Sequence, residues 1–222
     1  MPIREKESYE PMNEKDAIRS AKMLVDIFEK LKIEYWFDYG SLLGIIRDKK
    51  FIPWDTDLEP YIRFNDEETP FALIDELEAK GFTVKMCPFT RGYSKGIILS
   101  QEKGYVDMSI GFFKQTYKGR FFGWICHHLP TFIRIWIIHY MQKHYSESKS
   151  EIIRPKEQSK RDKNRISSWV RACFPVFFCS KLKKVDFYDF KVSVPGKAEE
   201  LLLMRYGEDW KIPKKVFRSY TT

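Results

Sequence analysis

The chain has 222 residues, of which 43% are hydrophobic and 16% are aromatic. This composition excludes a disordered protein and is enough for one folded domain with a sizeable core. Lys and Arg together number 39 and Asp and Glu 31, so the formal charge is +8. A basic balance favours anionic partners, such as nucleotides, phosphorylated glycans, nucleic acid or acidic lipid, but charge alone does not choose among them.

The N-terminal residues 1–16 are charged and polar, so we predict that they encode no secretory signal. Asn13 or Asp16 can cap a helix that extends to about Lys32, because apolar residues then recur at spacings of three and four. We expect this helix to pack against the core and to take no part in chemistry.

The segment 35–62 combines a Gly-Ser pair, an arginine and two carboxylates. Residues 35–37 are apolar and predict a strand, Gly40 and Ser41 predict a tight turn, and residues 41–47 predict a helix. The first amides of a helix have no partner within it, so they form a ready anion site.

Residues 51–64 predict a second strand that carries Asp55 and Asp57. Residues two apart on a strand share one face, and two carboxylates there repel each other and raise each other's pKa. We therefore expect a divalent metal ion between them. Pro60 lacks the N–H for one ladder bond, which predicts that this strand lies at an edge or ends early.

A helix over residues 70–80 and strands over 82–86 and 95–100 are expected next, and then a strand over 105–110 that carries Asp107. A lone buried carboxylate is costly unless it is paired or binds a metal. An aspartate on an edge strand that faces water is the other interpretation. If this strand is a neighbour of the one predicted over residues 51–64, Asp107 becomes a third oxygen ligand of a hard cation.

The apolar region 121–145 is interrupted by Pro130 and Arg134, so it is too short to span a bilayer, which takes about 20 residues. We expect core helices that cap the sheet; the alternative is an interfacial helix in contact with a membrane surface, which would hold a glycolipid acceptor close. Residues 146–165 are polar and basic, which predicts a solvated loop, or else a lid over an anionic donor or a tether to acidic lipid.

The four cysteines are too scattered for a disulfide scaffold, and we expect buried thiols. Two alternatives stay open: a zinc site at Cys126, His127 and His128, and a bridge between Cys173 and Cys179 in an oxidising lumen. At the C-terminus, residues 187–194 predict a strand and residues 196–206 a helix that Gly207 ends.

Three motifs in order, GSLLGIIR, FIPWDTD and VDMSI, resemble the LicD and fukutin family of the nucleotidyltransferase-fold superfamily. The segment DFYDFKVSVPGKAEELLLMRYGEDWKIPKK resembles the fukutin-type ending. Together these stretches cover roughly half of the chain and lie in the family's order. Any one motif is weak evidence, whereas the ordered set is specific.

The resemblance implies an α+β fold, in which a nucleotidyltransferase-like mixed sheet is flanked by helices. It implies a single catalytic domain over residues 1–222. Within it we expect an N-terminal helix (1–32), the nucleotidyltransferase-like core (33–112), an aromatic helical insertion with the basic loop (121–165) and a C-terminal segment (166–222).

The resemblance also implies a metal-dependent transferase that moves a phospho-alditol or phosphocholine group from a CDP-linked donor to a glycan or glycolipid hydroxyl. Asp55, Asp57 and Asp107 match the catalytic and metal-binding carboxylates, with Mg²⁺ or Mn²⁺ as the cofactor, and Gly40 and Ser41 match the turn that binds donor phosphate. By charge and position, Arg47, Arg91 and Lys95 are candidate phosphate contacts. The family implies a Golgi or other secretory-pathway membrane; a cytoplasmic, membrane-associated location is the alternative.

Two departures from the family pattern keep other functions open. Tyr39 stands where the family often has a second glycine, and Glu59-Pro60 stands where it has an aspartate and an apolar residue. A non-catalytic binding partner with the same fold is therefore an alternative. An Asp-x-Asp nucleotide-sugar glycosyltransferase is another, although its motif normally follows a longer sheet region. We expect no nucleic-acid binding, because no aromatic-interleaved basic motif is present.

Overall fold

The computed structural model describes residues 10–66, 68–86, 93–100, 104–114, 130, 133 and 178–214. Its centre is a five-stranded mixed sheet in the order β1-β2-β5-β4-β3. Strands β2 and β5 are parallel, and the other neighbouring pairs are antiparallel. The strands are β1 (Glu34–Phe37), β2 (Pro60–Phe64), β3 (Phe82–Met86), β4 (Tyr93–Ser100) and β5 (Met108–Lys114).

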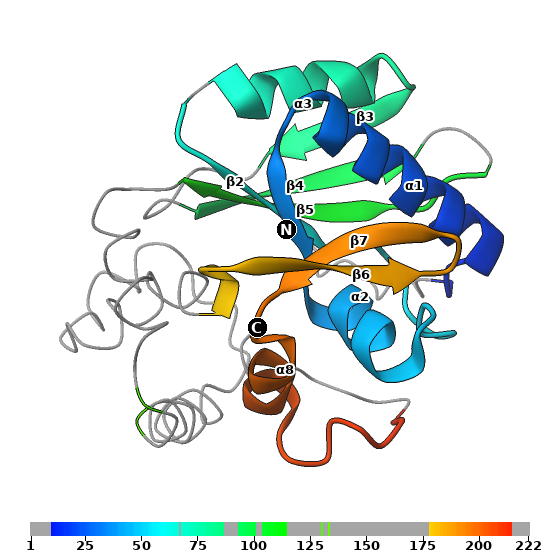
Figure 1. The fold of residues 1–222 in the computed structure, drawn as a ribbon. Coiled ribbons are helices and arrows are strands. Elements are labelled where there is room, and N and C mark those ends of the chain that lie inside the picture. The colour runs from blue at the N-terminus through cyan, green and yellow to red at the C-terminus, as the bar shows by residue number, and fades with distance from the viewer. Residues whose placement is uncertain are drawn as a thin grey trace, which may run out of the picture.

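Helices lie on both sides of the strands, so the α+β fold class is confirmed. Figure 1 shows α1 and α3 in the upper part of the molecule and α2 and α8 in the lower part. Helix α2 is short and continues directly into a π-helical segment, η1. The helices are α1 (Glu14–Lys30), α2 (Tyr39–Leu43), η1 (Gly44–Asp48), α3 (Glu68–Glu78) and α8 (Ala198–Tyr206).

The helix ends follow the local sequence. Asn13 is the N-cap of α1, and its side chain accepts hydrogen bonds from the Lys15 and Asp16 amides at 3.0 and 3.4 Å. Helix α8 ends at Gly207, which has a positive φ of 82° that suits glycine. Both predicted ends are confirmed.

The C-terminal β-structure is a hairpin rather than the single strand predicted over 187–194. It consists of β6 (Leu182–Phe187) and β7 (Phe190–Pro195), which are antiparallel with Phe187 opposite Phe190. Tyr188, with a φ of 51°, lies in the two-residue turn between them. The prediction is confirmed over residues 190–194, which belong to β7, and its start at residue 187 was wrong because residues 187–189 form the end of β6 and the turn.

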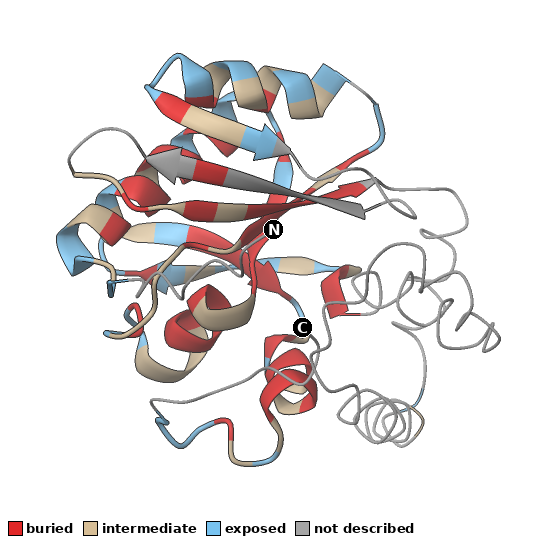
Figure 2. Cartoon of the chain, turned by 180° about the vertical axis from the view of Figure 1, so that it is seen from behind, coloured by how far each residue is buried: buried red, intermediate tan, exposed pale blue. Residues whose placement is uncertain are grey.

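The core lies between the sheet and the elements packed on it, and the buried residues concentrate along the central strands, α2 and α8 (Figure 2). Phe28 of α1 stacks on Tyr35 of β1 with ring centroids 4.7 Å apart. Trp36, Ile62 and Phe112 are fully buried on successive strands of the sheet. Burial of such large apolar side chains is the main source of stability of the domain.

The predicted strand over residues 51–64 is largely wrong, because β2 begins only at Pro60. Asp55 and Asp57 therefore lie in the loop before β2 instead of on one face of a strand. Nor is β2 an edge strand, since it lies between β1 and β5. Pro60 is tolerated there because it is the first residue of the strand, paired with Phe37.

Several sequence predictions fall outside the described residues. These are the helical region 121–145, apart from Pro130 and Ile133, the basic loop 146–165, and the cysteines at 87, 126 and 173. Cys179 is buried and belongs to no disulfide within the described part of the chain. Among the same residues, no helix is both long enough and apolar enough to cross a membrane.

Candidate active site

The residues singled out in the sequence gather at one end of the central sheet. Strand β1 runs antiparallel to β2, and β2 runs parallel to β5, so the end of β1 lies beside the beginnings of β2 and β5. Gly40 and Ser41 follow β1, Asp55 and Asp57 precede β2, and Asp107 directly precedes β5. The topology thus brings three distant stretches of sequence to the same edge.

Asp57 and Asp107 occupy matching positions on adjacent chain segments. The N–H of Leu58 donates to the carbonyl oxygen of Asp107 at 3.1 Å, and the N–H of Ser109 donates to the carbonyl oxygen of Leu58 at 2.7 Å. These bonds form an isolated parallel bridge between Leu58 and Met108. Each aspartate is the residue before a bridge partner, so the expectation that the two segments are neighbours is confirmed.

Asp55 is a half-buried carboxylate, and one of its two oxygens is buried without a hydrogen-bond partner in the described part of the chain. Its Oδ1 accepts a hydrogen bond from the Thr56 amide at 3.1 Å, whereas its buried Oδ2 has no hydrogen-bond partner among the described residues. Burial, with the charge of Asp57 added, raises the pKa of Asp55 to about 7. A cation bound here would offset both effects, so the residues present fit an oxygen-ligated metal ion.

Gly40 lies against this carboxylate from the first turn of α2. A Cβ atom at position 40 would lie 2.3 Å from Asp55 Oδ2, a distance at which the carboxylate would have to move. The N–H of Gly40 donates to Glu59 Oε2 at 2.8 Å, and the N–H of Glu59 donates to Ser41 Oγ at 3.1 Å. The anion that this turn binds in the structure is therefore the Glu59 carboxylate.

Sequence reasoning missed a buried ion pair beneath the turn. Asp38 caps α2 by accepting from the Tyr39 amide at 2.8 Å, and its Oδ2 lies 2.7 Å from Arg205 Nη2 of α8. The Arg205 guanidinium also lies 3.6 Å from the Tyr39 ring centroid, in a cation–π arrangement. An arginine within the apolar run LLLMRY was the available signal, because a buried arginine needs a carboxylate partner.

Residues 32–197, well over half of the chain, match the family model described as LicD/FKTN/FKRP, nucleotidyltransferase domain. The chain belongs to this family. The resemblance read from the three motifs is confirmed, and the family assignment supports a transferase.

Two curated relatives of this LicD-family chain are uncharacterized proteins of Rickettsia. One, from Rickettsia prowazekii (strain Madrid E), is 33% identical over 69 residues, which are 31% of this chain and 25% of that protein. The other, from Rickettsia typhi (strain ATCC VR-144 / Wilmington), is 31% identical over 77 residues, which are 33% of this chain and 25% of that protein. The matches thus span only a quarter of the length of each relative.

Solved structures of nucleotidyltransferases share a distant likeness with the LicD-family chain. The structure of Cid1 in complex with its short product ApU is 14% identical with a TM-score of 0.35, covering 85% of this chain and 61% of that one. The structure of a cytoplasmic RNA terminal U-transferase is 13% identical with a TM-score of 0.34, covering 85% and 60%. At these scores the likeness carries no functional weight.

Of the three candidate phosphate-binding cations of the LicD-family chain, the structure describes the side chain of Arg47 only. Arg47 forms an ion pair with Asp48 at 2.7 Å, and its Nη1 lies 3.5 Å from the carbonyl oxygen of Trp210. The structure thus directs Arg47 toward the C-terminal tail. Arg91 lies outside the described residues, and so does the side chain of Lys95, whose backbone belongs to β4.

A divalent ion in this LicD-family site would need ligands from the substrate as well as from the protein. In the described ranges, no group of three or more His, Cys, Asp or Glu side chains is arranged to hold a metal ion. Mg²⁺ is commonly held by one or two carboxylates together with substrate phosphate oxygens, so Asp55 and Asp57 suit such a shared site. Asp107 lies next to Asp57 along the parallel bridge.

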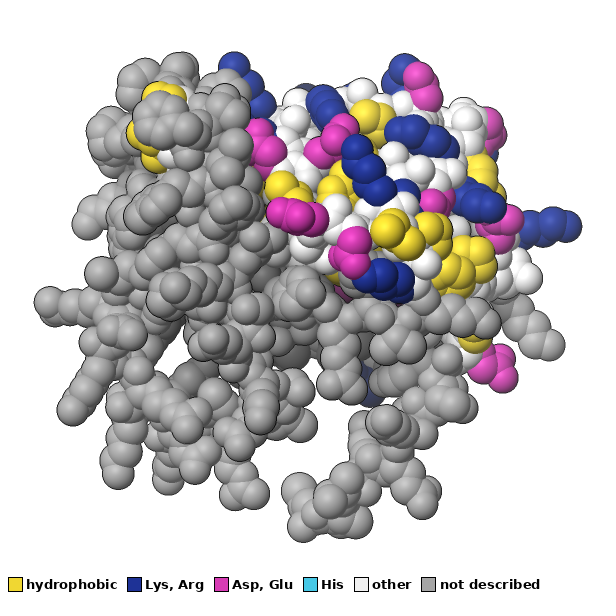
Figure 3. Space-filling model, turned by 90° about the horizontal axis from the view of Figure 1, so that it is seen from below, with side chains coloured by type: hydrophobic (Ala, Val, Ile, Leu, Met, Phe, Trp, Pro, Cys, Tyr) yellow, Lys and Arg dark blue, Asp and Glu magenta, His cyan; other side chains and the backbone are white. Residues whose placement is uncertain are grey.

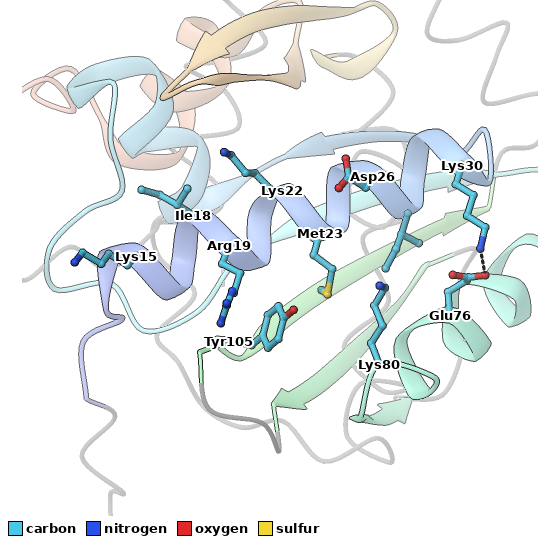
Figure 4. Close-up of a pocket in the computed structure, with 11 residues that line it drawn as sticks. Lys15, Ile18, Arg19, Lys22, Met23, Asp26, Lys30, Glu76, Lys80 and Tyr105 are labelled. Atoms are coloured by element: carbon cyan, nitrogen blue, oxygen red, sulfur yellow. Dashed lines mark hydrogen bonds and ion pairs between the residues drawn. The ribbon is translucent and has the colours of Figure 1, made fainter.

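A separate groove of about 560 Å³ runs along α1 and is bordered by α3 and Tyr105 (Figure 4). None of the three site aspartates lines it. Two of its lysines already have acidic partners, since Lys30 pairs with Glu76 at 2.6 Å and Lys22 pairs with Asp189.

On the described part of another face, basic and acidic side chains are interspersed, so the net positive charge forms no uniform patch there (Figure 3).

Proposed function

We propose that this chain is a metal-dependent transferase of the LicD family, which moves a phospho-alditol or phosphocholine group from a CDP-linked donor to a glycan or glycolipid hydroxyl. The observation that supports the proposal is that the Leu58–Met108 bridge places the backbone of Asp107 beside that of Asp57, two residues after Asp55, whose buried Oδ2 has no hydrogen-bond partner among the described residues. Carboxylates grouped in this way suit chemistry on a phosphate-rich substrate.

The reaction asks the protein for positioning and for neutralisation of negative charge. The acceptor hydroxyl oxygen forms a bond to the donor phosphorus next to the transferred alcohol, the bond from that phosphorus to the CMP oxygen breaks, and CMP leaves. In this scheme Asp55 and Asp57 hold Mg²⁺ or Mn²⁺, which when bound neutralises diphosphate charge. Asp107 orients the acceptor hydroxyl and takes its proton.

Gly40 has a steric role in the same scheme. Because it lacks a Cβ, the Asp55 carboxylate can lie against the turn after β1, where a larger residue would displace it. The turn thereby brings the donor phosphate close to the metal-binding carboxylates. The Glu59 carboxylate must leave the Gly40 amide if a donor phosphate oxygen is to bind there.

That contact favours a second candidate function, a non-catalytic module that binds a glycan or another enzyme through the same fold. Tyr39, in place of the family's frequent glycine, is a second feature in its favour. A module of this kind would bind no cytidine nucleotide in a metal-dependent way and would release no CMP.

Thermal-shift measurements with CTP, CDP-choline, CDP-ribitol and CDP-glycerol, each with and without Mg²⁺ or Mn²⁺, test the proposal. A bound donor raises the melting temperature, and the expected rise depends on the metal. CMP release in the presence of a glycan acceptor is the activity readout, and Asp57→Asn should abolish it. Full turnover in Asp57→Asn would overturn the site assignment, and a lack of any metal-dependent shift would favour the binding module.

The proposal extends to location. A glycan or glycolipid acceptor fits a Golgi or other secretory-pathway membrane, with residues 121–145 as a candidate membrane-surface contact. Fractionation of cells that express the protein tests this. Recovery in the soluble cytoplasmic fraction alone would contradict it.

A further inference from the structure

Two hydrogen bonds tie the N-terminal segment 12–20 to the loops that carry the site aspartates. The N–H of Met12 donates to the carbonyl oxygen of Asp55 at 2.7 Å. The N–H of Val106 donates to Ser20 Oγ at 3.0 Å, and Ser20 is fully buried. One bond therefore ends on a site aspartate and the other on the residue before Asp107.

The segment between these two anchors is stiff. It is the first half of α1, a helix of 17 residues that Asn13 caps. Ala17, Ala21 and Leu24 are completely buried, so one face of the helix is fixed against the core. A packed helix has a set length, so the two anchors hold the two loops at a set separation.

Side-chain contacts support the anchor near Asp107. The Arg19 guanidinium lies over the Tyr105 ring, 5.5 Å from its centroid, and Figure 4 shows the two side chains next to each other. A Cβ at Gly104, whose φ is 96°, would lie 2.4 Å from Arg19 Nη1. The chain thus makes room for the arginine directly before the Asp107 segment.

A third contact fixes the beginning of the other loop. The hydroxyl of Tyr188, in the β6–β7 turn, donates to Glu14 Oε1 at 2.6 Å and accepts from the Phe51 N–H at 3.1 Å. Phe51 is four residues before Asp55. The start of the N-terminal segment is therefore connected to this loop at two points, from Glu14 to Phe51 through Tyr188 and from Met12 to Asp55 directly.

We propose that Met12 and Ser20 are positioning residues of the aspartate site, which set the separation between the Asp55–Asp57 loop and Asp107. The inference rests on the proposed function, because a metal site is what makes that separation matter. Helix α1 precedes the family match over residues 32–197, and from the sequence we expected it only to pack against the core. Its hydrogen bonds to the two loops give the N-terminal segment a second role, that of positioning the aspartates.

Mn²⁺ binding, followed by the electron paramagnetic resonance signal of the free ion, tests the effect on the site. Ser20→Ala removes the acceptor of the Val106 amide and is expected to weaken Mn²⁺ binding about fivefold, the effect of one lost hydrogen bond. Val25→Ala is the matched control, because it truncates a buried residue of the same helix that bonds to neither loop. Its Mn²⁺ affinity should equal that of the unaltered protein.

Met12 provides a second pair of variants. Met12→Pro removes the N–H that bonds Asp55, whereas Met12→Ala keeps it. We expect weaker Mn²⁺ binding in the proline variant and unchanged binding in the alanine variant. Equal Mn²⁺ affinity in Ser20→Ala, Met12→Pro and the two controls would overturn the inference.

Amide hydrogen exchange provides a readout that needs no metal. Ser20→Ala should speed exchange in residues 104–110 relative to Val25→Ala, because the Val106 amide loses its partner. If the unaltered protein binds no Mn²⁺, the proposed function fails, and this exchange comparison alone decides whether Ser20 positions the Asp107 segment. Equal exchange rates in the two variants would show that it does not.

Discussion

Arg205 Nη2 lies 2.7 Å from Asp38 Oδ2, and the two side chains are only 3% and 4% exposed. Asp38 follows β1 and caps α2, whereas Arg205 comes from α8, which is 167 residues later in the chain. The pair joins the C-terminal helix to the turn that contains Gly40. The C-terminal segment therefore supports the site without supplying a site aspartate.

We predict that Arg205→Met destabilises the protein by about 3–5 kcal/mol, because it leaves the Asp38 charge buried without its partner. Urea unfolding at pH 7 measures the loss. The exposed pair of Lys191 and Asp186 provides the control, since Lys191→Met should cost less than about 1 kcal/mol. Addition of Asp38→Asn to Arg205→Met should recover part of the loss. Equal losses in Arg205→Met and Lys191→Met would contradict the assignment.

Tyr39 adopts a φ of 45°, in the left-handed region that favours glycine. We predict that Tyr39→Gly is more stable than Tyr39→Ala by about 1 kcal/mol, because both variants lose the ring contact with Arg205 and only alanine keeps the backbone strain. Ala72→Gly, in the regular helix α3, should show the opposite sign and a loss of about 1 kcal/mol. Thermal unfolding of the variants measures these differences, and a Tyr39→Ala variant as stable as Tyr39→Gly would refute the strain.

The same residue shows what sequence reasoning can find. Tyr39 stood out as a departure from a family glycine, and the structure shows the physical reason for a glycine there, the positive φ. The compensation, a guanidinium from α8 stacked on the ring, depends on a contact between positions 166 residues apart. No local pattern predicts such a contact.

The gathering of the aspartates could be predicted and their local structure could not. Asp107 was expected beside the Asp55–Asp57 segment, and the bridge between Leu58 and Met108 confirms this. The long strand over residues 51–64 was wrong, because alternation of apolar residues does not distinguish a strand from a loop anchored by tertiary bonds such as that from the Met12 amide. The positioning role proposed for Met12 and Ser20 was missed because it too depends on tertiary hydrogen bonds, which the local sequence does not show.

Gly40→Ala should impair function far more than stability. The added Cβ meets the Asp55 side chain, which can shift at low cost, whereas in Gly44→Ala the Cβ would lie 2.5 Å from the backbone oxygen of Lys50. We therefore expect Gly44→Ala to be the less stable variant. In Gly40→Ala, displacement of the carboxylate should lower metal-dependent CMP release about 100-fold. Melting temperature and CMP release separate the two effects, and full turnover in Gly40→Ala would argue against a role for Asp55 in the site.

Asp55 provides a pH-dependent test of the site. Burial and the charge of Asp57 raise its pKa from 3.8 to about 7, so the folded protein holds this proton more tightly than the unfolded chain does. The stability that this carboxyl group contributes is therefore fully present below about pH 4, and it is lost as the pH rises to about 7.

We predict that Asp55→Asn raises the metal-free stability at pH 8, by up to about 4 kcal/mol for a shift of this size, and has little effect near pH 4. Urea unfolding at the two pH values, with EDTA present, measures the difference. Asp48→Asn is the control: Asp48 already pairs with Arg47, so its loss should not stabilise the protein at either pH. Mg²⁺ should stabilise the unaltered protein at pH 8 and not Asp55→Asn, because the cation offsets the charge that the substitution removes. If Asp55→Asn were no more stable than the unaltered protein at pH 8, the Asp55 carboxylate would not carry the uncompensated charge on which the metal site depends.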